Sequence, residues 1–103
     1  MSEFSNEFDG GNYIYALRLR GLPWSATSSD IADFLENRCA TNAVTIVIGR
    51  DGRPSGEALV GFNEEGDWTF CKLKHKQHMG KRYVEVYERY GHYNYRRLFF
   101  QHV

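Results

Sequence analysis

Apolar residues recur along this chain of 103 residues with two different periods, and the order of these periods constrains the fold more than any other feature. In Tyr15–Gly21, leucines alternate with arginines, which is typical of a strand buried on one face. Thr27–Asp30 has the spacing of a helix capping box, and apolar residues follow it at i, i+3 and i+4. We therefore predict a strand followed by a helix of about ten residues.

The next segment has the pattern of a β-hairpin. Every residue of Val44–Ile48 is β-branched, and such residues favour strands. Gly49–Pro54 is rich in residues that favour turns, and it carries Arg50 and Arg53. Glu57–Phe62 then resumes a strand pattern. We expect two antiparallel strands joined by a long basic loop.

A second helix and a last strand complete the pattern. Residues 64–76 begin with acidic residues and end with lysines, which matches the dipole of a helix, and Trp68 and Cys71 share one face. Arg82–Tyr87 alternates again between apolar and polar residues. This alternation predicts one more half-buried strand.

The predicted order β, α, β, β, α, β defines an α+β fold of the split βαβ type. This is the arrangement of a domain that resembles an RNA-recognition motif (RRM). We expect a four-stranded antiparallel sheet, with two helices covering one face and the other face open. Residues 13–87 form this single domain, because about 100 residues build one core. Residues 1–12 are expected to be a flexible lead-in. The aromatic and basic tail, residues 88–103, packs over the open sheet face, extends a binding surface or stays loose.

Composition argues against several classes of protein. No apolar run approaches the roughly 20 residues of a membrane span, and the acidic N-terminal residues do not resemble a signal peptide, so we expect a soluble, unexported monomer. Cys39 and Cys71 lack the spacing of a disulfide framework or a zinc site, so we expect reduced, buried thiols and no metal or other cofactor. The sequence has no glycine-rich phosphate loop or nucleophile–base pair, so we do not expect an enzyme.

The formal net charge is +0, but the charges are unevenly distributed. Residues 72–103 hold eight basic and two acidic residues, and nine of the 16 aromatic residues lie from Trp68 onward. A phosphate backbone responds to local potential within a Debye length of about 10 Å, and aromatic rings can stack on bases. The C-terminal third therefore favours a nucleic-acid partner.

The first and third predicted strands lack the rings on which an RNA-recognition motif stacks bases. Those positions carry Arg18, Glu57 and Leu59, and Glu57 would repel phosphates. We predict that the binding groups lie around the loops instead: Arg20, Trp24, Arg50, Arg53, Lys81, Arg82 and Tyr83. Two rings and several guanidinium groups suit an unstacked guanine, whose O6 and N7 accept two parallel bonds from one arginine. An alternative interpretation places Trp24 over the core beneath the first helix.

Three stretches resemble the signature segments of the quasi-RNA-recognition motifs of the heterogeneous nuclear ribonucleoprotein F/H family: Arg18–Trp24, Gly52–Ala58 and Met79–Val86. The related Fusilli-type epithelial splicing regulators have similar stretches. The resemblance implies a domain that binds guanine tracts in single-stranded RNA through its loops and keeps these tracts from forming quadruplexes. It also implies a role in pre-mRNA splicing and processing in the nucleus, with the cytoplasm as an alternative location and other splicing factors as further partners.

The resemblance also assigns residues. On the matching positions, the guanine-caging residues of the family fall on Arg20, Trp24, Arg53 and Tyr83. Lys72 and Leu73 depart from the apolar stripe of the family's second helix, so we expect that helix to be shifted or locally irregular. The alternative function is a protein-interaction domain of a splicing complex, which would use the helical face or the aromatic tail.

Overall fold

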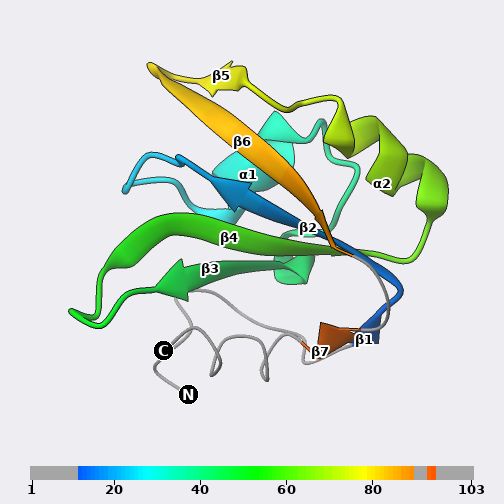
Figure 1. Ribbon diagram of the computed structural model, residues 1–103, viewed down its shortest axis with the longest axis horizontal. Coiled ribbons are helices and arrows are strands. Elements are labelled where there is room, and N and C mark those ends of the chain that lie inside the picture. The colour runs from blue at the N-terminus through cyan, green and yellow to red at the C-terminus, as the bar shows by residue number, and fades with distance from the viewer. Residues whose placement is uncertain (1–11, 90–92, 95–103) are drawn as a thin grey trace.

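Five strands form an antiparallel sheet that carries two helices on one face (Figure 1). The computed structural model of the protein describes residues 12–89 and 93–94, so most of the predicted lead-in and tail lies outside the described residues. The elements are β1 (Asn12–Tyr13), β2 (Tyr15–Arg20), α1 (Ser28–Phe34), η1 (Thr41–Ala43), β3 (Val44–Ile48), β4 (Pro54–Phe62), α2 (Glu65–Lys72), β5 (Gln77–Met79), β6 (Arg82–Arg89) and β7 (Tyr93–Asn94). The sheet order is β3–β4–β2–β6–β5, and β1 pairs with β7 in a separate ribbon. The α+β class is confirmed, and the sheet has one strand more than predicted.

Strand β2 lies at the centre of the sheet, paired with β4 on one side and with β6 on the other. Leu17 and Leu19 are fully buried on the face that the helices cover. Arg18 and Arg20 lie on the opposite face, because side-chain direction alternates along a strand. The predicted alternation is confirmed.

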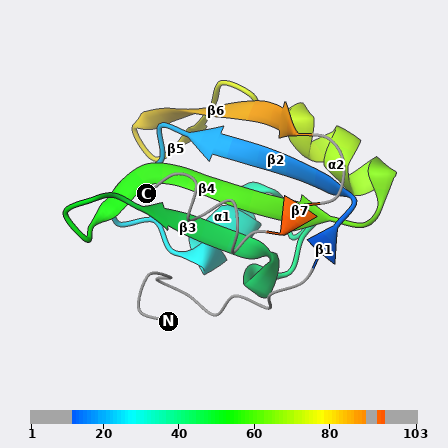
Figure 2. The same ribbon diagram turned by 60° about the horizontal axis from the view of Figure 1, so that its bottom comes forward.

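The sheet face away from the helices is partly covered, whereas the sequence predicted an open face. Figure 2 shows the β1–β7 ribbon near one end of the sheet. The ring of Tyr13, from this ribbon, packs against Gly61 of β4, where an added Cβ would lie 2.3 Å from the ring. Five buried residues form a second apolar cluster: Tyr13, Ala16, Ala43, Val47 and Leu59. Leu59 faces away from the helices, as predicted, but this cluster buries it.

The two ends of helix α1 are set by local backbone and side-chain contacts. The Thr27 hydroxyl accepts the N–H of Asp30 at 3.0 Å, and the Asp30 carboxylate accepts the N–H of Thr27 at 2.9 Å, so the predicted capping box is confirmed. The helix ends at Phe34, because Glu36 and Asn37 adopt left-handed backbone conformations with φ of 56° and 59°. It therefore has seven residues and is shorter than predicted.

Helix α2 also ends earlier than predicted, at Lys72 instead of Lys76. Leu73 lies after the helix and is exposed, which explains why it departs from the apolar stripe. Lys76 adopts a left-handed backbone conformation with φ of 68° and donates its N–H to the carbonyl of Val84 at 2.7 Å. This turn directs Gln77–Met79 alongside β6 as the fifth strand, which the sequence did not predict.

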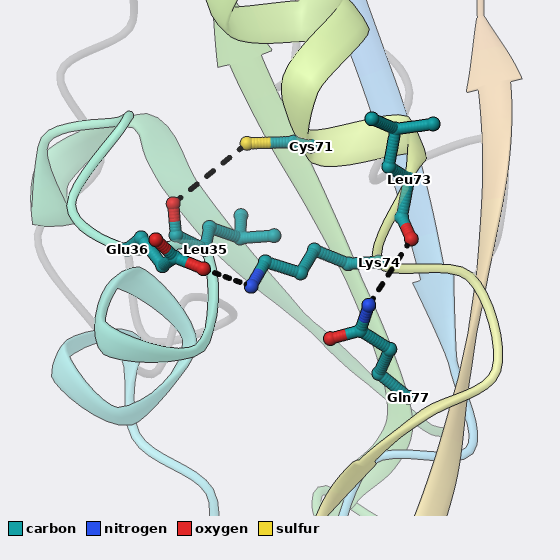
Figure 3. Close-up of polar contacts among 6 residues, drawn as sticks. All are labelled: Leu35, Glu36, Cys71, Leu73, Lys74 and Gln77. Carbon is teal, nitrogen blue, oxygen red and sulfur yellow. Dashed lines mark hydrogen bonds and ion pairs between the residues drawn. The ribbon is translucent and has the colours of Figure 1, made fainter.

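Side-chain contacts join the C-terminal ends of the two helices (Figure 3). The thiol of Cys71 donates to the carbonyl of Leu35 at 3.9 Å, and Lys74 forms an ion pair with Glu36. Cys39 and Cys71 are free thiols; Cys71 is buried, as predicted, whereas Cys39 is only half-buried. Burial is the main reason why the pKa of Cys39 rises to about 12 and the pKa of Cys71 to about 11. Both thiols are therefore protonated and unreactive at neutral pH.

We expect Gly61→Ala to destabilise the protein by about 1–3 kcal/mol, because the new methyl group would overlap the ring of Tyr13. The free energy of unfolding in urea measures this effect. Gly66→Ala is the matched control, since nothing lies within 4 Å of a Cβ at this exposed position in α2. Alanine there should raise stability by about 0.5–1 kcal/mol. Equal effects of the two substitutions would contradict the packing of Tyr13 on Gly61.

Candidate nucleic-acid interface

Three loops meet at the end of the sheet where β2 and β3 finish and where β4 and β6 begin (Figure 1). We call this end the loop rim; it consists of the loop residues 21–27, 49–53 and 80–81 together with the flanking strand ends Arg20 and Arg82. The N–H of Leu22 donates to the carbonyl of Gly56 at 3.0 Å, and Nε of Arg82 donates to the carbonyl of Gly21 at 3.2 Å. These bonds connect segments that are far apart in the sequence.

Arg20, Trp24 and Arg82 line one open hollow of about 440 Å³ at the loop rim. This volume is within the usual range for small-molecule sites. Glu57 and Glu85 also line the hollow, so its wall combines guanidinium and carboxylate groups. Trp24 is 72% exposed, which contradicts the alternative position over the core.

Trp24 also borders a second hollow, of about 270 Å³, on the side of the β3–β4 loop. Asp51, Arg53 and Pro54 line this hollow. The Asp51 carboxylate accepts the N–H of Arg53 at 3.0 Å, and this local turn shapes the loop. Trp24 thus borders two hollows, each with an arginine in its wall.

Tyr83 lies beside the loop rim, at the start of β6, and is 63% exposed. Its ring centroid lies 4.2 Å from that of His78, its Cα partner in the β5–β6 hairpin. Its carbonyl approaches the β2–α1 loop so closely that a Cβ at position 21 would lie 2.7 Å from the carbonyl oxygen. Gly21, with φ of +85°, permits this approach. Its backbone thus approaches Gly21, which lines the larger hollow, but Tyr83 itself lines neither hollow.

The basic side chains of the loop rim form no ion pairs with described residues, whereas four basic side chains elsewhere on the domain are paired. Four basic side chains form ion pairs with carboxylates: Arg18, Arg38, Lys72 and Lys74. The predicted loop cations form no ion pair with any residue in the described part of the chain: Arg20, Arg50, Arg53, Lys81 and Arg82. Arg50 and Lys81 are exposed and line neither hollow. Lys72 and Lys74, two of the lysines at the end of the segment predicted as the second helix, are both ion-paired.

The outer sheet face carries an ion pair at the positions where RNA-recognition motifs stack bases. Nε of Arg18 lies 2.9 Å from Oε1 of Glu57. The Arg18 guanidinium lies 5.9 Å from the ring centroid of Tyr87 on the neighbouring strand. Leu59, the Cα partner of Arg18 in β4, is buried. The positions of Arg18, Glu57 and Leu59 therefore offer neither a free cation nor an aromatic ring.

Three residues near the predicted binding groups were not predicted from the sequence: His78, which contacts Tyr83, and Glu85 and Tyr87. Glu85 and Tyr87 line the larger hollow with Arg20, and the register pairs Arg20 with Glu85. Alternation along β6 predicts that Glu85 and Tyr87 point away from the core. Only the strand order shows that β6 lies beside β2. The pKa of Tyr87 is raised, mainly by the neighbouring Glu85 side chain.

The described residues contain neither a metal-binding cluster nor a membrane-spanning helix. Within residues 12–89 and 93–94, no three His, Cys, Asp or Glu side chains are placed to hold a metal ion. In the same ranges, no helix is long and apolar enough to cross a bilayer.

His75 has a structural contact in the fold. Its Nδ1 accepts the N–H of Val86 in β6 at 3.0 Å.

Comparison with known proteins assigns the class of this domain. The family model described as the RRM domain matches residues 17–94. The chain therefore belongs to the RNA-recognition-motif family, whose members are non-catalytic RNA-binding domains.

Individual relatives define the type of RNA-recognition motif. The chain is 38% identical over 90 residues to mouse G-rich sequence factor 1, an alignment that covers 84% of this chain and 18% of that protein. It is 37% identical over 81 residues to rat heterogeneous nuclear ribonucleoprotein F, covering 76% of this chain and 20% of that protein. The crystal structure of human G-rich RNA sequence binding factor 1 matches with a TM-score of 0.68 and 38% identity, covering 73% of this chain and 79% of that chain. These relatives confirm the resemblance to quasi-RNA-recognition motifs of the F/H type. The chain spans about a fifth of the length of the curated relatives it matches.

Trp24 is 72% exposed and Trp68 is 5% exposed, so we expect acrylamide to quench two fluorescence components of different accessibility. Trp24→Phe should remove the accessible component and leave the weakly quenched emission of Trp68, whose indole N–H donates to the carbonyl of Ala16 at 3.0 Å. A variant that is quenched as strongly as the wild type would show that Trp24 does not lie in solvent.

Proposed function

We propose that this domain binds guanine tracts in single-stranded RNA at the loop rim. The observation that carries the proposal is the position of Trp24, which borders one hollow with Arg20 and Arg82 and another with Arg53. An exposed indole ring can stack on a base, and a guanidinium group can donate two parallel hydrogen bonds to O6 and N7 of guanine. The combination suits a guanine that is unstacked from its neighbours.

The other loop residues have supporting roles in this proposal. Tyr83 provides a second exposed ring, next in the chain to Arg82 of the larger hollow. Arg50 and Lys81 lie outside the hollows and contact phosphates, which strengthens binding without selecting a base. The Arg18–Glu57 pair leaves the neighbouring sheet positions without free charge. Recognition of the bases therefore falls to the loop rim.

The relatives support the choice of RNA and the cellular setting. The names of G-rich sequence factor 1 and G-rich RNA sequence binding factor 1 specify guanine-rich sequences. The similarity to heterogeneous nuclear ribonucleoprotein F supports a role in pre-mRNA splicing and processing in the nucleus. The domain corresponds to a fifth of such proteins, so on its own it should bind RNA weakly, without the avidity of linked domains.

We expect the domain to bind a short RNA with three consecutive guanines about tenfold more tightly than matched adenine or uridine tracts, a difference that corresponds to one well-made base contact. Arg20→Ala, Trp24→Ala and Tyr83→Ala should each weaken guanine-tract binding by about 1–3 kcal/mol, measured by fluorescence anisotropy titration. Lithium buffer keeps the guanine tract single-stranded.

Arg38→Ala is the control for this experiment. It removes the same charge from the helical side, where Arg38 is paired with Asp67 at 3.3 Å, and should bind RNA like the wild type. Equal affinities for the three tracts would refute the selectivity for guanine. Wild-type affinity in all three loop variants would refute the location at the loop rim.

A further inference from the structure

Arg20 has a glutamate on each side in the sheet. The register pairs it with Glu57 of β4 and with Glu85 of β6. All three residues line the larger hollow, together with Trp24. A hollow that served only to bind phosphates would not need carboxylates, because they repel the RNA backbone. These carboxylates therefore require a different explanation.

The two glutamates differ in their partners. Oε1 of Glu57 lies 2.9 Å from Nε of Arg18, so this carboxylate is held by a cation on its own sheet face. Glu85 forms no ion pair with any residue that the structure describes. It lies two residues from Tyr87 on the outer face of β6, and both residues line the larger hollow. An ionised carboxylate has about four acceptor positions, so Glu85 keeps positions for a ligand.

The chemistry of the bases identifies a ligand for such a carboxylate. Guanine carries two donors side by side, N1–H and N2–H₂, and one carboxylate can accept a hydrogen bond from each. Adenine places the acceptor N1 beside its amino group, and this acceptor would repel the carboxylate. O6 of guanine lies next to N1–H, within reach of an arginine beside the glutamate. The neighbouring pair Arg20 and Glu85 matches this sequence of acceptor and donors.

We propose that Glu85 determines the selectivity for guanine by accepting hydrogen bonds from N1–H and N2–H₂ of one guanine in the larger hollow, while Arg20 donates to O6 of the same base. This inference rests on the proposed binding of guanine tracts. In this arrangement, Glu85 forms hydrogen bonds with the Watson–Crick edge of the guanine, and Trp24 stacks on the face of its ring.

Inosine tests the contact, because it differs from guanosine only by the missing N2 amino group. Each of the three guanines is replaced in turn by inosine, and affinities are measured for the wild type and for Glu85→Gln, a substitution of nearly unchanged size. At one position, inosine should weaken binding to the wild type about tenfold, the loss of about one hydrogen bond to a charged group. The same replacement should weaken binding to Glu85→Gln less than about twofold.

Glu64→Gln is the matched control, since it removes one negative charge from an exposed residue at the start of α2 and should retain the full inosine effect. An inosine effect that is equal in the wild type and in Glu85→Gln would overturn the assignment of Glu85 but leave guanine-tract binding intact. If inosine has no effect on binding to the wild type, the assignment of Glu85 is likewise overturned, and guanine-tract binding is left intact. A wild type that does not prefer guanine over adenine would overturn the proposed function, and the role of Glu85 with it.

Discussion

Strand β2 is hydrogen-bonded to β4 on one side and to β6 on the other, and this double pairing fixes which side chains can meet a ligand. A shift of one residue would move Leu17 and Leu19 out of the core and bury the arginines, so the register is strongly determined. The indole N–H of Trp68 donates to the carbonyl of Ala16 at 3.0 Å and ties α2 to the same strand. With the leucines held inside, Arg20 must lie on the outer face, where β2 leaves the sheet for the loop rim.

The sheet face and the loop rim differ in what they offer to RNA. On the sheet face, charge is neutralised by the Arg18–Glu57 pair, and Leu59 is buried in the second apolar cluster. At the loop rim, the indole of Trp24 is exposed and the neighbouring arginines have no ion pair within the described ranges. The loop rim therefore offers stacking and guanidinium contacts that the positions of Arg18, Glu57 and Leu59 on the sheet do not offer. The strands of the sheet position the three loops of the loop rim.

The sequence was sufficient where neighbouring residues determine the structure. The capping box at Thr27 and the alternation around Leu17 depend on local spacing, and both are confirmed. Strand β5 was not predictable, because it depends on the left-handed turn at Lys76 and on pairing with β6. The burial of Leu59 depends on Tyr13, which lies far away in the sequence.

The candidate site also combines features set by local sequence with features set by contacts between distant segments. Loop position alone was enough to select Arg20, Trp24 and Arg53, and the structure brings them around two adjoining hollows. That Glu85 and Tyr87 line the same hollow as Arg20 became visible only with the register between β2 and β6.

Amide chemical-shift mapping with a guanine-tract RNA tests the central claim most directly, because it reports on loops, sheet and helices in one titration. The account predicts that the largest shift changes occur in residues 20–24, 51–56 and 82–87, with small changes at Thr45, Leu59 and Gly61. Changes centred on the outer sheet face, at Val47, Leu59 and Gly61, would contradict it.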